Sequence, residues 1–296
     1  MIFFFISRSI SVAVSAFILS SGVKFANKYK NVKLSYIDFI TERLYKIYIP
    51  YIFVVCLYYF YFIFRGNITD FNLIELLKYI ISGQLAAPFY FIIVIMQFYI
   101  LAPLWLVFCK KIHVSIGILL AISITSLTHY FFKNSTYSNY CFTPYLIYWI
   151  SGCYIGLNFD KCMNFLRKIK KPIIVIGILF TIAYTTFAYM LSINENTHLT
   201  NDAVEITRIL FCLFASLMYL LLIKDKKNKF INAMSYCTYY VYLIHSLIIF
   251  ETDYIMTSFE INALGYRFII RLVLTFLLPF GLSLVCVGIK KLLSKK

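Results

Sequence analysis

Long apolar runs, separated by shorter polar segments rich in Lys and Arg, follow one another along almost the whole chain. A helix needs about 20 mostly apolar residues to cross the ~30 Å hydrocarbon core of a bilayer, because it rises about 1.5 Å per residue. Backbone polar groups in lipid must be satisfied within the segment, so each such run is expected to be helical. The nine runs that meet or approach this length are residues 2–21, 47–64, 89–108, 113–132, 143–157, 172–192, 206–223, 236–250 and 266–289.

Not all of the predicted spans are long enough for a straight helix to cross the bilayer. Runs 143–157 and 236–250 are short for a full span, which predicts tilted or re-entrant helices, or helices with snorkelling neighbours. The run 2–21 is interpreted as a span rather than a signal peptide, because it contains Arg8 and its basic flank follows it. No internal repeat, linker or barrel-type alternation divides the chain. The sequence therefore predicts an all-α, polytopic transmembrane bundle of about nine spanning helices, forming one integral-membrane domain over residues 1–296.

Composition agrees with a membrane protein and argues against a soluble enzyme. Hydrophobic residues make up 62% of the chain, charged residues only 14%, and the mean hydropathy is +0.83. A soluble chain of this length lacks the polar surface to cover so much apolar side chain. The eight cysteines include no CxxC pair and mostly lie in apolar runs, so we expect no metal site and no redox site. Soluble-enzyme motifs such as GxGxxG, HExxH and GxSxG are absent from the sequence.

The net charge of +16 is distributed unequally between the polar segments. Alternate segments carry 21 of the 28 Lys and Arg with only four acids, whereas the rest of the chain has seven bases and eight acids. The basic side is expected to be cytoplasmic, where such residues also attract anionic lipid. This pattern predicts a multi-pass protein of a bacterial plasma (inner) membrane, with its N-terminus outside, its C-terminus cytoplasmic, and the lipid bilayer rather than nucleic acid as partner. The basic segments are residues 23–46, 109–112, 158–171, 224–235 and 290–296.

Four polar side chains fall inside predicted spans, where ionisable groups are costly and are usually functional or paired. Arg8, His245 and Arg271 lie about five or six residues from the outer ends of their spans, which is roughly 8–9 Å below the surface. Gln97 lies somewhat deeper. We expect these side chains to converge on one polar cavity that opens outward. The alternative is that the arginines snorkel to the interface and His245 hydrogen-bonds a neighbour; for His245 we favour a functional role.

Four segments stand out by their motifs rather than by their polarity. They are residues 14–22 (VSAFILSSG), 42–51 (ERLYKIYIPY), 89–103 (FYF…QFY…P) and 234–245 (MSYCTYYVYLIH). In this order and at these spacings they resemble motifs of the membrane acyltransferase-3 family, and the resemblance covers nearly the whole chain. Ser15 stands where the family usually has Pro, and Pro88 where it often has His.

The resemblance implies an enzyme that O-acylates cell-surface polysaccharides and related polymers. Such an enzyme moves an acetyl or other short acyl group from cytoplasmic acyl-CoA, its donor substrate, to an extracytoplasmic saccharide hydroxyl. By this resemblance Arg43 and Lys46, at the cytoplasmic mouth of a span, would bind the acyl-CoA phosphates. His245 would be the general base or support it. For Arg43 and Lys46 the alternative is that they only set the orientation of the chain in the membrane.

One family feature is missing from the sequence. The family's first helix carries an Arg followed about eleven residues later by a His, and no such pair occurs here, so that helix is expected to precede Met1. The explanations are a start codon placed too late, a natural fragment or a degenerate member of the family. Two alternative functions therefore stay open, a polysaccharide export or transport protein and an inactive truncated family member.

Overall fold

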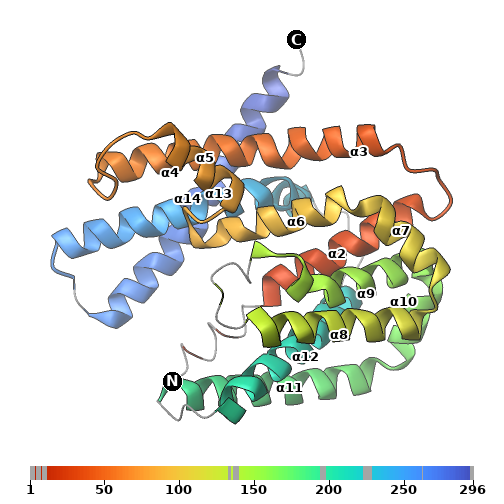
Figure 1. Ribbon diagram of the computed structural model, residues 1–296. Helices are drawn as coiled ribbons and strands as arrows, with labels where there is room; N and C mark the ends of the chain where they lie inside the picture. Colours follow the sequence, from red (N-terminus) through yellow and green to blue (C-terminus); the bar gives the residue numbers. More distant parts are fainter. Residues whose placement is uncertain are drawn as a thin grey trace. The chain divides into compact units, whose positions relative to one another are not determined.

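The computed structural model describes Phe4, Arg8 and residues 12–132, 135, 140–193, 198–222, 229–261 and 263–293. Among these residues the regular elements are all helical and none is a strand, which confirms the predicted helical membrane protein (Figure 1). In chain order the helices are α2 (Val12–Tyr29), α3 (Tyr36–Arg43), η1 (Leu44–Tyr48), α4 (Ile49–Phe64), α5 (Leu73–Ser82), η2 (Ala87–Phe89), α6 (Tyr90–Ile100), α7 (Ala102–Lys111), α8 (Val114–Phe132), η4 (Thr143–Tyr145), α9 (Leu146–Leu157), α10 (Phe159–Lys168), α11 (Lys170–Ser192), α12 (His198–Leu222), α13 (Lys229–Ser258) and α14 (Leu264–Leu293).

Four helical stretches among the described residues are long and apolar enough to cross a membrane. They match the predicted spans 47–64, 113–132, 172–192 and 206–223, and a fifth is added if one bent helix pair counts as a single span. The four stretches are Tyr36–Phe64, Val114–Phe132, Lys170–Ser192 and Asn201–Leu222. The total of about nine spans stays a prediction, and much of the predicted span 2–21 lies outside the described residues.

The predicted span 89–108 is interrupted. Helix α6 ends at Ile100 and α7 begins at Ala102, with Leu101 between them at φ −86° and ψ 8°. Pro103 explains the break, because its ring has no N–H to donate and clashes with the carbonyl four residues earlier. Before this break, α5 is joined to the helical stretch Ala87–Ile100 with a bend of 56°. The sequence did not predict α5, which lies in a segment read as a loop between spans.

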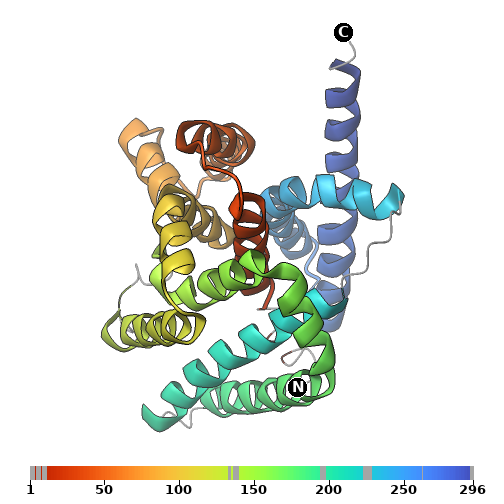
Figure 2. The same cartoon turned by 90° about the vertical axis from the view of Figure 1, so that its right-hand side faces the viewer.

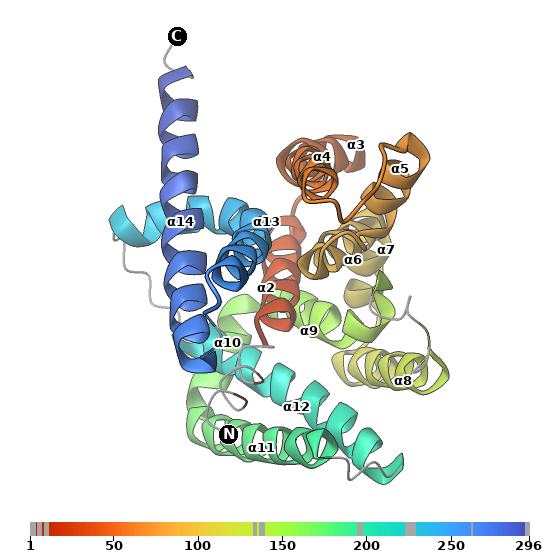
Figure 3. The ribbon, with the colours of Figure 1, turned by 90° about the vertical axis from the view of Figure 1, so that its left-hand side faces the viewer.

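The chain forms two compact units, and each is described by itself. The first comprises residues 1–41 and 94–224. In it α2 packs along α9, and α11 pairs with α12, as Figures 2 and 3 show. Every residue of α9 from Leu146 to Gly156 is buried. This explains how so short a helix is stable there: it is surrounded by protein rather than by lipid.

Glycines allow the close approach of α2 and α9. A Cβ atom at Gly22 would lie 2.6 Å from the Trp149 carbonyl oxygen, which is too close for any real side chain. Cβ atoms at Gly152 and Gly156 would meet the carbonyl oxygens of Leu19 and Val23. Small residues at such spacings let helix backbones approach in membranes, where packing contributes much of the association energy.

The second unit comprises residues 42–93 and 225–296. Its longest elements, α13 and α14, pack against one another, and α13 also contacts α4 and η2 (Figure 3). Helix α5 packs on α4. This unit holds four of the six candidate site residues singled out from the sequence, namely Arg43, Lys46, His245 and Arg271.

Candidate functional site

A wide helical turn interrupts the motif segment 42–51. Residues Leu44–Tyr48 form a π-helical turn between α3 and α4, in which the Ile49 amide bonds the Leu44 carbonyl five residues earlier. The cause lies in Pro50, which cannot donate to the carbonyl four residues before it and would clash with it in a regular α-helix. Single π turns of this kind often mark functional sites.

Three of the four motif segments meet in the second unit. The Tyr239 hydroxyl donates to the Ile47 carbonyl at 2.6 Å, which joins α13 to the π turn. The Tyr242 hydroxyl donates to the Pro88 carbonyl, and the Tyr242 ring packs edge-on against Phe91 with centroids 5.6 Å apart. Tyr239 therefore binds the motif segment 42–51, and Tyr242 binds Pro88, directly before the segment 89–103, each through a backbone carbonyl.

His245 has a defined orientation on α13. Its Nδ1 lies 2.6 Å from the Tyr242 carbonyl oxygen, and its Nε2 lies 3.4 Å from the Ser246 hydroxyl. A carbonyl can only accept a hydrogen bond, so Nδ1 must carry the proton and the neutral ring keeps its lone pair on Nε2. This is the tautomer that a general base needs if Nε2 is to take a proton.

A tyrosine side chain of α4 hydrogen-bonds the turn of α13 that carries His245. The fully buried Tyr58 donates to the Leu243 carbonyl at 3.0 Å and accepts from the Leu247 amide at 2.7 Å. In a regular helix these two backbone groups would bond each other, because they are four residues apart. The Tyr58 hydroxyl thus bridges the two ends of one helical hydrogen bond around His245. Sequence reasoning missed this residue, which resembles its many neighbouring tyrosines.

Arg271 is paired with an acid of the same unit. Its Nε donates to the Asp253 carboxylate, while Arg267 donates to the Thr257 hydroxyl at 2.7 Å. Asp253 lies eight residues after His245 on α13, which is about 12 Å along a helix. Arg271 therefore joins α14 to the end of α13, and its predicted role in a cavity with His245 stays a prediction.

A second charged cluster, which sequence reasoning missed, joins α4 to α13. Glu251 accepts hydrogen bonds from Arg65 and from the Tyr61 hydroxyl, the latter at 2.7 Å. The Arg65 guanidinium also lies over the Tyr254 ring, 3.8 Å from its centroid. The hydrogen bond from Arg65, followed by that from Tyr61, lowers the pKa of Glu251 below its ordinary value. The available signal was that Arg65 and Glu251 directly follow two predicted spans, 47–64 and 236–250.

Gln97 and Arg8 belong to the first unit. Both ends of the Gln97 amide are occupied, since its Nε2 donates to the Tyr140 carbonyl at 2.8 Å and its Oε1 accepts from the Phe142 amide at 2.9 Å. Gln97 therefore anchors a loop. Arg8 is exposed, and its guanidinium lies 5.2 Å from the centroid of the Phe4 ring. The predicted convergence of these two residues with His245 and Arg271 stays a prediction.

The two residues assigned to acyl-CoA differ in their surroundings. Lys46 is exposed and forms an ion pair of 2.6 Å with Glu42, one helical turn earlier. Arg43 is half-buried in the last turn of α3, directly before the π turn. No group of three or more His, Cys, Asp or Glu is placed to hold a metal ion within the described part of the chain.

Comparison with known proteins shows which family the chain belongs to. No solved structure is significantly similar to the chain. A Staphylococcus aureus protein named as a probable poly-beta-1,6-N-acetyl-D-glucosamine export protein is 26% identical over 315 residues, covering 99% of this chain and 82% of that protein. A Staphylococcus epidermidis protein of the same name is 26% identical over 224 residues, covering 69% of this chain and 58% of that protein. The chain thus spans somewhat less than two thirds of the S. epidermidis relative. The model of one family, described as an acyltransferase domain, matches residues 1–288, and the chain therefore belongs to the acyltransferase-3 family of membrane proteins.

Proposed function

We propose that this protein is a membrane O-acyltransferase. It would move an acetyl or other short acyl group from acyl-CoA on the cytoplasmic side to a hydroxyl of a saccharide on the outer side. The observation that carries the proposal is the distance of 2.6 Å between His245 Nδ1 and the Tyr242 carbonyl oxygen, from which we infer that Nδ1 carries the proton and Nε2 is the basic atom. Family membership over residues 1–288 supports the same reaction class.

The proposed reaction needs only one proton carrier. The acceptor hydroxyl oxygen attacks the thioester carbonyl carbon while its proton passes to Nε2 of His245. The C–O ester bond forms, the C–S bond breaks, and the CoA thiolate then takes the proton back from His245. A base with a pKa near the working pH suits both steps.

The donor side of the proposal rests on the segment around the π turn. CoA carries several phosphates, and Arg binds phosphate through two parallel hydrogen bonds whereas Lys acts as a point charge. Arg43 is the stronger candidate of the two, because its guanidinium can bind a phosphate through two hydrogen bonds and it directly precedes the π turn. The orientation that this requires, with residues 23–46 and the C-terminus cytoplasmic and the N-terminus outside, follows the distribution of basic residues.

A histidine substitution in cells tests this function. The full gene carrying His245→Ala is expected to leave surface polysaccharide without its acyl groups at normal protein level. The matched control is His113→Ala, an exposed histidine at the start of α8. Acyl content of the polymer is measured by NMR. Equal acylation in the His245→Ala strain and the wild type would overturn the proposal.

A second candidate function is export of the polysaccharide itself, which is favoured by the names of the staphylococcal relatives. The two functions separate in strains carrying His245→Ala or Arg43→Ala. Loss of acyl groups with normal polymer secretion supports the enzyme. Loss of secretion with unchanged acylation of the residual polymer supports the exporter.

A further inference from the structure

Helix α5 has three distinct faces. Leu76 and Ile80 are buried against the rest of the unit, and Leu73, Leu77 and Ile81 form an exposed apolar strip at four-residue spacing. The third face is polar and carries Glu75, Lys78 and Ser82. A wholly apolar second strip would suit a helix that simply faces lipid. A helix with a separate polar strip can instead present that strip to water or to a ligand.

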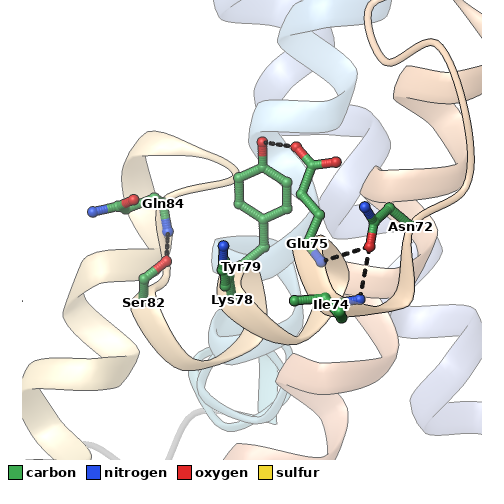
Figure 4. Close-up of a pocket in the computed structure, with 7 residues that line it drawn as sticks. All are labelled: Asn72, Ile74, Glu75, Lys78, Tyr79, Ser82 and Gln84. Atoms are coloured by element: carbon green, nitrogen blue, oxygen red, sulfur yellow. Dashed lines mark hydrogen bonds between the residues drawn. The ribbon is translucent and has the colours of Figure 1, made fainter.

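The polar strip lines a pocket of about 400 Å³ (Figure 4). Six of the seven lining side chains carry hydrogen-bonding groups, and Ile74 is the seventh. Figure 4 shows the Tyr79 ring in the middle of the group, with its hydroxyl directed at the Glu75 carboxylate at a distance of 3.1 Å. The lining residues are Asn72, Ile74, Glu75, Lys78, Tyr79, Ser82 and Gln84.

The pocket is built on a firmly capped helix. The Asn72 side-chain oxygen accepts from the amides of Ile74 and Glu75, which caps the N-terminus of α5. At the other end Gly83 adopts a left-handed conformation with φ 69°, as helix C-terminal glycines commonly do. Two buried tyrosines of α4 hydrogen-bond the backbone near both ends of α5. Tyr59 exchanges hydrogen bonds with the Asn72 backbone, and Tyr51 donates to the Ile80 carbonyl at 3.0 Å.

Several lining groups have unused hydrogen-bonding capacity. Among the described residues, no hydrogen bond engages the Lys78 ammonium, the Gln84 side-chain amide or the Asn72 Nδ2 group. These supply donors, while Gln84 and the second Glu75 oxygen supply acceptors. A ligand that satisfies them all must offer both donors and acceptors on neighbouring atoms. Sugar hydroxyls do so, since each donates once and accepts twice.

Other ligand classes fit this lining less well. A phosphate group offers only acceptors and would meet the Glu75 carboxylate, which repels it. An acyl chain would leave the polar groups desolvated without partners, since Ile74 is the one aliphatic side chain of the lining. We propose that this pocket binds a sugar residue of the saccharide acceptor, an inference that rests on the proposed function.

The position of the pocket along the chain agrees with this role. The segment between the predicted spans 47–64 and 89–108 is expected on the outer side, where the acceptor lies. From Gln84 the chain runs four residues to Pro88, whose carbonyl binds the Tyr242 hydroxyl. The Tyr242 carbonyl in turn accepts from His245. The pocket and the proposed base are thus joined through one short backbone segment.

Binding of a defined saccharide tests the inference. The full-length protein in nanodiscs is titrated with a β-1,6-linked N-acetylglucosamine pentasaccharide, a fragment of the polymer in the names of the staphylococcal relatives, and binding is followed by calorimetry. The double variant Lys78→Ala/Gln84→Ala is expected to bind roughly 10-fold more weakly, about the loss of two net hydrogen bonds. The matched control is Leu77→Ala, on the exposed apolar strip of the same helix, which should bind as the wild type does.

The outcomes of this titration are distinguishable. Weaker binding by the double variant alone, with unfolding temperatures like that of the wild type, supports the pocket. Absence of binding by the wild type, equal binding by the double variant, or an equal loss in Leu77→Ala would overturn it, as would competition by inorganic phosphate. If the wild type binds the pentasaccharide but never acylates it, the pocket stands and the acyltransferase proposal fails. If acylation proceeds with unchanged KM in the double variant, the function stands and the pocket fails.

Discussion

The Tyr58 hydroxyl accepts a hydrogen bond from the Leu247 amide at 2.7 Å, although 189 residues separate the two in sequence. The same hydroxyl donates to the Leu243 carbonyl, so a side chain of α4 occupies a place in the backbone hydrogen bonding of α13. His245 lies between these two backbone groups. Its orientation therefore depends on α4 as well as on its own helix.

Replacing Tyr58 with Phe should lower the stability of the protein and the acyl-transfer rate together. The change leaves the Leu247 amide to find another partner, which costs about 1–3 kcal/mol if it finds none. Thermal unfolding in detergent and acyl transfer to saccharide are the measurements. Tyr130→Phe, at an exposed tyrosine of α8, is the matched control. Unchanged rate and stability in Tyr58→Phe would show that the bridge has no positioning role.

Because α2 and α9 cross at close range, one methyl group added at their contact should lower the stability of the protein. Gly152→Ala places a Cβ against the Leu19 carbonyl, where neither backbone can give way cheaply. Overpacking of this kind costs roughly 1–3 kcal/mol or more. The control is Gly281→Ala in α14, where an added Cβ meets nothing within 4 Å. Unfolding temperatures of the two variants should differ by several degrees, and equal values would contradict the observed packing.

The Arg65–Glu251 pair predicts a dependence of stability on pH. Because the folded protein lowers the pKa of Glu251 from its ordinary value of 4.5, the pair stabilises the fold above that pH. The stabilisation is lost as the pH falls below 4.5 and through the lowered pKa of the folded state. Unfolding temperatures of the wild type and Glu251→Gln are compared from pH 7 to pH 3. The wild type should be more stable at pH 7 and lose this advantage in acid, whereas a constant difference would contradict the assignment.

Gln97 should act on a loop rather than on chemistry. Gln97→Ala removes both hydrogen bonds to the segment Tyr140–Phe142, and amide hydrogen exchange there is expected to accelerate. Gln97→Glu keeps an acceptor for the Phe142 amide but loses the donor to the Tyr140 carbonyl, so an intermediate effect is expected. If amide exchange is unchanged in both variants while acyl transfer is lost, Gln97 acts in the predicted cavity and not on the loop.

The features that could be predicted from the sequence are those that depend on residues close together in the chain. Apolar runs of about 20 residues identified four helical stretches that are long and apolar enough to cross a membrane, although Tyr36–Phe64 begins eleven residues before the predicted span 47–64. The alternative that His245 hydrogen-bonds a neighbour was also open from the sequence, and the structure shows such a bond to the Tyr242 carbonyl three residues earlier. Helix α5 carried its own signals as well, an Asn before an apolar run and a Gly after it, which the reading as a loop overlooked.

Features that depend on distant residues could not be predicted from one sequence. Arg65 and Glu251 are 186 residues apart, and nothing in either segment identifies the other as its partner. Tyr58 is one of 26 tyrosines, several of them in the same helix. Gln97 was predicted to line a cavity because a polar side chain in an apolar run must find a partner, and the sequence did not reveal that its amide bonds the loop backbone. The contacts of all three features depend on tertiary packing.

Acyl transfer across a membrane is the most direct test of the central claim. Proteoliposomes containing the full-length protein are loaded with radiolabelled acetyl-CoA, and the β-1,6-linked N-acetylglucosamine pentasaccharide is added outside. Vesicles in which residues 23–46 face the lumen should transfer label to the outer saccharide, and those with His245→Ala should not. Label transferred equally by the His245→Ala protein, or no transfer by the wild type in either orientation, would contradict the account.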